Sequence, residues 1–184
     1  MNNVFNIINY SCDLISSGGI IIGFLLVFLE SFIPALPLSV FVILNVNTFG
    51  FIIGFIISWL ATSFGSYICY LLFILIGSKF SFKLLKNKIN LFSNIKFSEL
   101  ALILTLPFTP SFLINIMCGL TKMNKKKFIG AVLIGKFFTI IFWGYIGKSF
   151  LDNLYDFKSI LYVLTTIIIS YILSKIINKK FKIE

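Results

Sequence analysis

Residues 97–121, FSELALILTLPFTPSFLINIMCGLT, form an apolar stretch with Pro107 and Pro110 near its centre. Its length suits one membrane crossing, which takes about 20 residues, but proline breaks a helix interior. Lysines flank it on both sides, at Lys79, Lys83, Lys86, Lys88 and Lys96 before it and at Lys122, Lys125, Lys126 and Lys127 after it. Lysine-rich loops stay on the cytoplasmic side. The stretch is therefore expected to enter the membrane, turn at Pro107–Pro110 and leave on the same side.

The composition is that of an integral membrane protein. Of 184 residues, 59% are hydrophobic and 12% charged, whereas soluble domains have about 25% charged residues. All sixteen cations are lysines, and the net charge is +10. Because these lysines lie at the ends of apolar segments, they indicate orientation and contact with anionic headgroups, and no nucleic-acid partner is expected. Without histidine, a metal site or cofactor is not expected.

The apolar segments divide the chain into membrane-crossing and interrupted parts. They are 18–33, 34–47, 49–77, 97–121, 128–147 and 159–178. The last two are ordinary spans, and 49–77 is long enough that it must tilt, or bend near Gly54 or Gly65. Loop 148–158 carries balanced charges, as an outside loop does. The C-terminus and the 79–96 loop are therefore expected in the cytoplasm of a multi-pass cell-membrane protein.

A second proline pair, Pro34 and Pro37, interrupts the chain after the first apolar segment. Segment 34–47 is too short to cross and return as regular helices, and we expect it to form a hairpin that opens outward. Two opposed, interrupted hydrophobic segments in corresponding places predict an inverted-repeat transporter with a site near the midplane. The expected fold is all-α and polytopic. Residues 1–17 would form an interfacial amphipathic helix, 18–178 one transmembrane domain, and 179–184 a basic cytoplasmic tail.

Two ionisable residues stand inside apolar sequence. Glu30 ends the first apolar helix, where it would act as a proton carrier or reach headgroup water. Lys136 lies about 12 Å into its span by helical rise. It would either snorkel to the interface or provide a cation for a lipid phosphate or for Glu30. The sequence alone leaves both pairs of alternatives open.

Polar residues beside the second proline pair have two possible roles. Asn115, Thr105, Thr109 and Ser111 would pair backbone groups freed by the prolines, or would contact lipid. Ser58, Thr62, Ser66 and Tyr70 recur at four-residue spacing along one helix face. That stripe would line a polar path for a headgroup or hold helices together.

These motifs together resemble the DedA-like, VTT-domain membrane proteins, also called the SNARE-associated Golgi protein family. The similar features, in chain order, are an acid leading into a proline-rich hairpin (Glu30 to Pro37), Gly54, Gly65-Ser66-Tyr67, Leu106-Pro107-Phe108-Thr109-Pro110, Asn115, Gly119-Leu120, Gly135 and Gly147. They span roughly residues 25–150. The resemblance implies two facing re-entrant loops and translocation of phospholipid or undecaprenyl phosphate, often dependent on the proton gradient. Many members have an arginine three residues before the second hairpin's first proline, where this chain has Leu104.

The expected function is translocation of an anionic lipid, with Glu30 coupling protonation to hairpin movement and Lys136 attracting the phosphate. Two alternatives stay open. One is a non-transporting protein that assists assembly or maintains the bilayer, and the other is a small-solute or ion transporter on the same fold. An intramembrane enzyme is disfavoured because the chain has no histidine, no paired acids at catalytic spacing and no Gly-x-Ser-x-Gly. The sequence does not indicate the oligomeric state.

Overall fold

A computed structural model describes residues 18–33, 37–77, 92–152 and 157–180, and these contain helices and no strand. The helices are Gly18–Glu30, α2 (Leu38–Phe49), α3 (Phe51–Gly77), α5 (Phe97–Thr105), α6 (Ser111–Leu120), α7 (Lys125–Asp152) and α8 (Phe157–Lys180). The expected interfacial helix 1–17, Pro34, all but the end of the 79–96 loop, and tail residues 181–184 lie outside the described residues.

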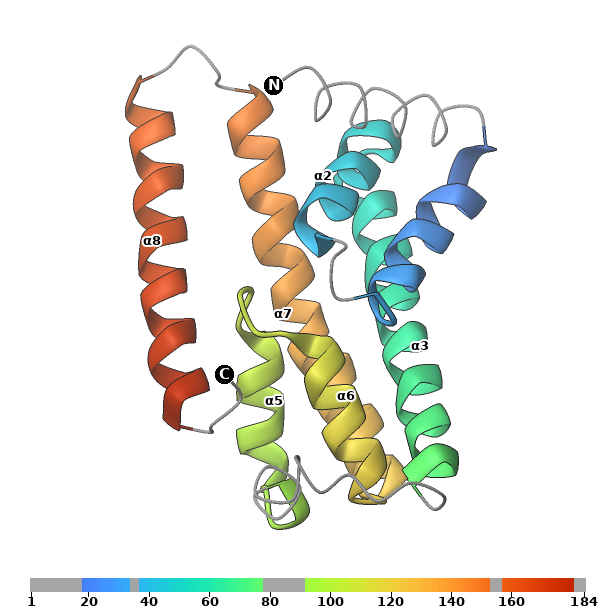
Figure 1. Ribbon diagram of the computed structural model, residues 1–184. Coiled ribbons are helices and arrows are strands. Elements are labelled where there is room, and N and C mark those ends of the chain that lie inside the picture. The colour runs from blue at the N-terminus through green and yellow to red at the C-terminus, as the bar shows by residue number, and fades with distance from the viewer. Residues whose placement is uncertain (1–17, 34–36, 78–91, 153–156, 181–184) are drawn as a thin grey trace.

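The long helices α3 and α7 form the centre of the molecule (Figure 1). They have 27 and 28 residues, which corresponds to about 40 Å at 1.5 Å per residue. Both contain a stretch long and apolar enough to cross a membrane. The α3 helix continues through Gly54 and Gly65 without interruption. These glycines instead allow close packing, because a Cβ on Gly54 would lie 2.5 Å from the Asn45 carbonyl oxygen.

Two helical hairpins lie against this pair, and their turns approach each other near mid-height (Figure 1). One hairpin is α5–α6, and its turn over 106–110 contains both Pro107 and Pro110, as predicted. The other joins helix Gly18–Glu30 to α2. The prediction that 34–47 forms a hairpin by itself is wrong, because 38–49 is one continuous helix. Pro37 is the N-cap of that helix, a place where its missing N–H costs nothing.

The hairpins make corresponding contacts with the two long helices. The first arm of each packs against a glycine: Phe28 and Ser31 meet Gly65 of α3, and Leu104 meets Gly135 of α7. The second arms pack further along the opposite long helix. Gly119 of α6 lies against Tyr70 of α3, and α2 contacts Gly144 and Gly147 of α7.

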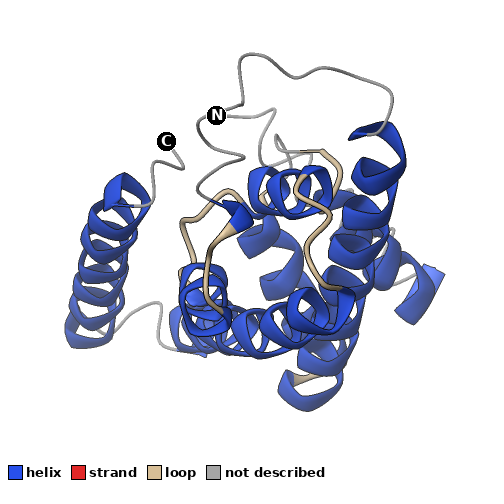
Figure 2. Cartoon of the chain, turned by 90° about the horizontal axis from the view of Figure 1, so that it is seen from below, coloured by secondary structure: helices blue, strands red, loops and turns tan. Residues whose placement is uncertain are grey.

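The α8 helix stands at the edge of the bundle in both views (Figures 1 and 2). Ile168, Ile169 and Ile172 on this helix are each at least half exposed. Tyr171 of the same helix packs edge-on against Phe108 in the turn of the second hairpin, with ring centroids 5.6 Å apart. The main core is formed by α3, α5, α6 and α7, where Tyr70 stacks on Phe128 with ring centroids 4.3 Å apart.

Lys122, in the turn between α6 and α7, has φ +50°, the one positive φ outside glycine among the described residues. The left-handed conformation costs a non-glycine residue about 1–2 kcal/mol. We therefore expect Lys122→Gly to raise the unfolding free energy by about 0.5–1 kcal/mol, measured by thermal unfolding in detergent. Lys125→Gly is the matched control: it also removes a lysine, but it places glycine in a helix and should destabilise. An equal loss of stability in both variants would contradict backbone strain at Lys122.

Candidate functional site

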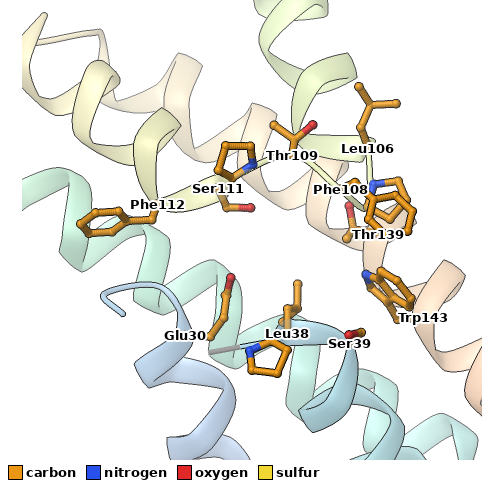
Figure 3. A pocket seen from close by; sticks show the side chains of 13 residues that line it. Glu30, Leu38, Ser39, Leu106, Phe108, Thr109, Ser111, Phe112, Thr139 and Trp143 are labelled. Atoms are coloured by element: carbon orange, nitrogen blue, oxygen red, sulfur yellow. The ribbon is translucent and has the colours of Figure 1, made fainter. Parts of the chain in front are cut away.

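A cavity of about 410 Å³ lies where the two hairpin turns meet (Figure 3). The first hairpin contributes Glu30, Pro37, Leu38 and Ser39, the second contributes residues 106–112, and α7 contributes Thr139 and Trp143. The polar and ionisable groups that line this cavity come from segments that are far apart in sequence. The packing of each hairpin on α3 and α7 is what brings them together.

The second arms of both hairpins begin at this cavity. The N-caps of α2 and α6 are Pro37 and Pro110, and neither helix has a side-chain cap. The first N–H groups of a helix have no partner within the helix, and they give that end a partial positive charge. Two such ends at one cavity, from opposite hairpins, form an environment suited to an anion.

Glu30 points from the end of its helix into the cavity (Figure 3). Its Oε2 atom is buried and has no hydrogen-bond partner. An unpaired buried carboxylate oxygen is costly. Glu30 is therefore suited to binding and releasing a proton, because the neutral acid avoids that cost.

Lys136 is fully buried on α7, and its Nζ donates a hydrogen bond of 2.7 Å to Ser111 Oγ. The alternative in which this lysine snorkels to the interface is therefore wrong. Ser111 is the first residue of α6 and lines the cavity. The charges of Lys136 and Glu30 interact. The structure thus brings the two ionisable candidates to one site, with Lys136 behind Ser111.

Of the other predicted site residues, Pro37, Pro107 and Pro110 line the cavity, whereas Asn115 and Gly119 do not. Gly119 is a packing residue, because its Cβ would lie 2.7 Å from the Tyr70 carbonyl oxygen. Asn115 is fully buried, and neither atom of its amide has a partner. The expectation that Asn115 pairs backbone groups of the hairpin is therefore wrong.

Thr139 and Trp143 were not expected in the site. Thr139 Oγ1 lies 2.8 Å from the Leu104 oxygen and 3.0 Å from the Thr105 oxygen, so its single hydrogen is donated to the carbonyls at the end of α5. Trp143 packs edge-on against Phe108 in the turn, at 5.4 Å between ring centroids. Gly135, Thr139 and Trp143 recur at four-residue spacing, a signal that would have marked this face of α7.

Leu104 is buried against Gly135, the residue before Lys136. Leu104, at the position where an arginine was expected from the resemblance, therefore packs on the residue before Lys136, and the Lys136 side chain itself bonds to Ser111. Within the described ranges, no three His, Cys, Asp or Glu side chains gather as a metal site would require.

Comparison with known proteins gives two matches. The model of the VTT domain matches residues 33–149, which is more than half of the chain. The uncharacterized membrane protein YhjE of Bacillus subtilis (strain 168) is 35% identical over 135 residues. That alignment covers 70% of this chain and 65% of YhjE, so the chain spans about two thirds of that relative. No solved structure shows a significant match. The chain belongs to the VTT-domain family of membrane proteins.

Proposed function

We propose that this protein moves an anionic lipid between the two leaflets of the cell membrane, with the lipid phosphate passing through the cavity between the hairpin turns. The observation that carries the proposal is the pair of uncapped helix N-termini at this cavity, with Lys136 beside one of them. Phosphate binds readily at helix N-termini. The cavity volume of about 410 Å³ lies within the usual range for small-molecule sites.

The proposal treats both hairpins as re-entrant and the two halves as an inverted repeat. The flanking lysines support cytoplasmic ends for α5 and α6. The matching contacts of Gly65 and Gly135 with the first arms support the repeat. In this arrangement the headgroup crosses between the turns while its tails stay in the hydrocarbon. The C-terminus and the 79–96 loop are then cytoplasmic.

Lys136 supplies the cation in this mechanism. It follows Gly135, the residue against which Leu104 packs, and in this proposal it takes over the task that an arginine at position 104 would perform. Lysine binds phosphate as a point charge, whereas arginine makes a two-pronged contact. The proposed site therefore selects for negative charge more than for headgroup geometry.

Glu30 makes binding depend on protonation. When Glu30 is ionised, its charge attracts Lys136 and repels a phosphate. When it is neutral, Lys136 and the two N-termini attract the phosphate without that opposition. Lipid binding therefore favours protonated Glu30, and release of the proton favours release of the lipid.

The test is lipid movement in proteoliposomes as a function of pH. A single controlling group changes the wild-type rate by up to about tenfold per pH unit. Glu30→Gln mimics the neutral acid, and we expect its rate to be nearly independent of pH over the range where the wild type varies. Glu99→Gln is the matched control: Glu99 is a half-buried carboxylate in the first turn of α5, it does not line the cavity, and its variant should keep the wild-type profile.

Two results would contradict the proposal. An unchanged pH profile in Glu30→Gln would remove this residue from the coupling. Proton flux without lipid movement in the wild type would instead favour a small-ion transporter on the same fold.

A further inference from the structure

Helices α3 and α6, which pack against each other at Gly119, carry buried polar atoms that have no partner. Thr62 Oγ1 and Ser66 Oγ on α3 are unpaired, as are both amide atoms of Asn115 on α6. All three residues are fully buried. A buried donor or acceptor without a partner costs about 1–3 kcal/mol. Several together indicate that something else occupies the interface.

These groups lie in one line. Helices α3 and α6 run in the same direction (Figure 1), and Gly119 lies against Tyr70. Asn115 is one turn before Gly119, and Ser66 is one turn before Tyr70, so Asn115 and Ser66 are neighbours across the interface. Thr62 comes one turn earlier again.

Paired polar groups lie at both ends of the row formed by Thr62, Ser66 and Asn115. Ser31, which follows Glu30, donates a hydrogen bond of 3.4 Å to the Thr62 carbonyl oxygen. At the other end, the Tyr70 hydroxyl donates a hydrogen bond of 2.5 Å to the Met123 carbonyl oxygen in the turn after α6. The unpaired groups therefore extend from the neighbourhood of Glu30 toward the 121–124 turn.

Water fits these groups better than a cation does. The Asn115 amide offers an unpaired donor and an unpaired acceptor at the same place. A bare cation would satisfy oxygens alone, whereas water both donates and accepts. Buried water in proteins makes about three hydrogen bonds to groups that otherwise have no partner.

We propose that ordered water fills the α3–α6 interface and links Glu30, past Ser66 and Asn115, to the 121–124 turn. The water gives Glu30 a route for proton exchange separate from the lipid cavity. The water itself follows from the unpaired groups, and its role in proton exchange rests on the function proposed for Glu30. The titratable described residues around these groups are Tyr67, Cys69 and Tyr70 on α3, Cys118 on α6, Lys122 in the 121–124 turn, and Lys127 and Lys136 on α7.

Cysteine accessibility tests the water directly. The background is the full chain in nanodiscs with Cys12→Ser, Cys69→Ala and Cys118→Ala, and the probe is the small cation 2-aminoethyl methanethiosulfonate. Ser66→Cys is compared with Ser63→Cys, because Ser63 is also buried and unpaired on α3 but lines an apolar groove with Leu60 and Phe64. Thiols react as thiolates, which need water.

We expect Ser66→Cys to react at least about tenfold faster than Ser63→Cys. Adding Asn115→Leu, which fills the interface with an apolar side chain, should reduce the Ser66→Cys rate to that of Ser63→Cys. Equal rates at the two positions, or no effect of Asn115→Leu, would overturn the proposal. Each variant is first checked for cooperative thermal unfolding. If a variant does not unfold cooperatively, a high-resolution structure of the wild type replaces the labelling test. Ordered water beside Asn115 would support the proposal, and its absence would overturn it.

The proton route has its own measurement. The carboxyl infrared band that Glu30→Gln removes reports protonation of Glu30, and its response to a pH jump should be slower in Asn115→Leu. If Glu30 responded to the pH jump as fast in Asn115→Leu as in the wild type, the proposed proton route would be overturned. Neither labelling nor infrared requires lipid movement, so failure of the lipid-transport proposal would appear separately in the proteoliposome assay.

Discussion

Lys136→Met is expected to lower the rate of lipid movement by about ten- to hundredfold, which corresponds to losing one charge-assisted contact of about 1.5–3 kcal/mol. Methionine keeps an unbranched side chain in a fully buried position but removes the cation and its hydrogen bond to Ser111. The site would then offer the phosphate two helix N-termini but no formal positive charge. The measurement is the initial rate in proteoliposomes at several lipid concentrations.

Lys148→Met is the matched control, because Lys148 is an exposed lysine near the other end of the same helix. It removes one positive charge without touching the cavity, and its rate should stay close to that of the wild type. Ser111→Ala should have a smaller effect than Lys136→Met, because it removes the hydrogen-bond partner and leaves the cation. Equal rates for Lys136→Met and Lys148→Met would exclude Lys136 from phosphate binding.

The sequence identified the second hairpin because two independent signals agreed there. Pro107 and Pro110 interrupt an apolar stretch, and lysines flank both of its ends. The sequence places the first hairpin on the wrong residues because Pro34 and Pro37 resemble a break within a hairpin, whereas Pro37 is the N-cap of α2. Nothing between 38 and 49 stops the helix, so α2 continues as one arm.

Glu30 and Lys136 were predictable because ionisable residues in apolar sequence are costly unless they face a polar site. Thr139 and Trp143 were not, because a threonine or tryptophan in a membrane helix is commonplace. Their place in the site depends on which face of α7 meets the turn, and that is set by tertiary packing. Asn115 shows the converse: a polar residue beside the prolines need not pair with them.

Gly135→Ala is expected to destabilise the protein by about 1–3 kcal/mol, the usual cost of overpacking. A Cβ there would lie 2.9 Å from the Leu104 carbonyl carbon and 3.1 Å from the Ala101 oxygen, and both are backbone atoms of α5. Backbone cannot rotate away, so α5 would have to move from α7. That shift would also lengthen the hydrogen bond that the Thr139 hydroxyl donates to the Leu104 and Thr105 oxygens.

Gly130→Ala separates this clash from the intrinsic effect of alanine. Gly130 is on the same helix and also faces α5, but its nearest neighbours would be ring atoms of Phe97, at 3.1 and 3.7 Å. Alanine in a helix interior gains up to about 1 kcal/mol over glycine, so Gly130→Ala should be neutral or stabilising in thermal unfolding. Because the displaced α5 carries the turn that lines the cavity, Gly135→Ala should also slow lipid movement while Gly130→Ala does not. Equal unfolding temperatures for the two variants would mean that α5 and α7 do not approach as closely at Gly135 as the packing of Leu104 requires.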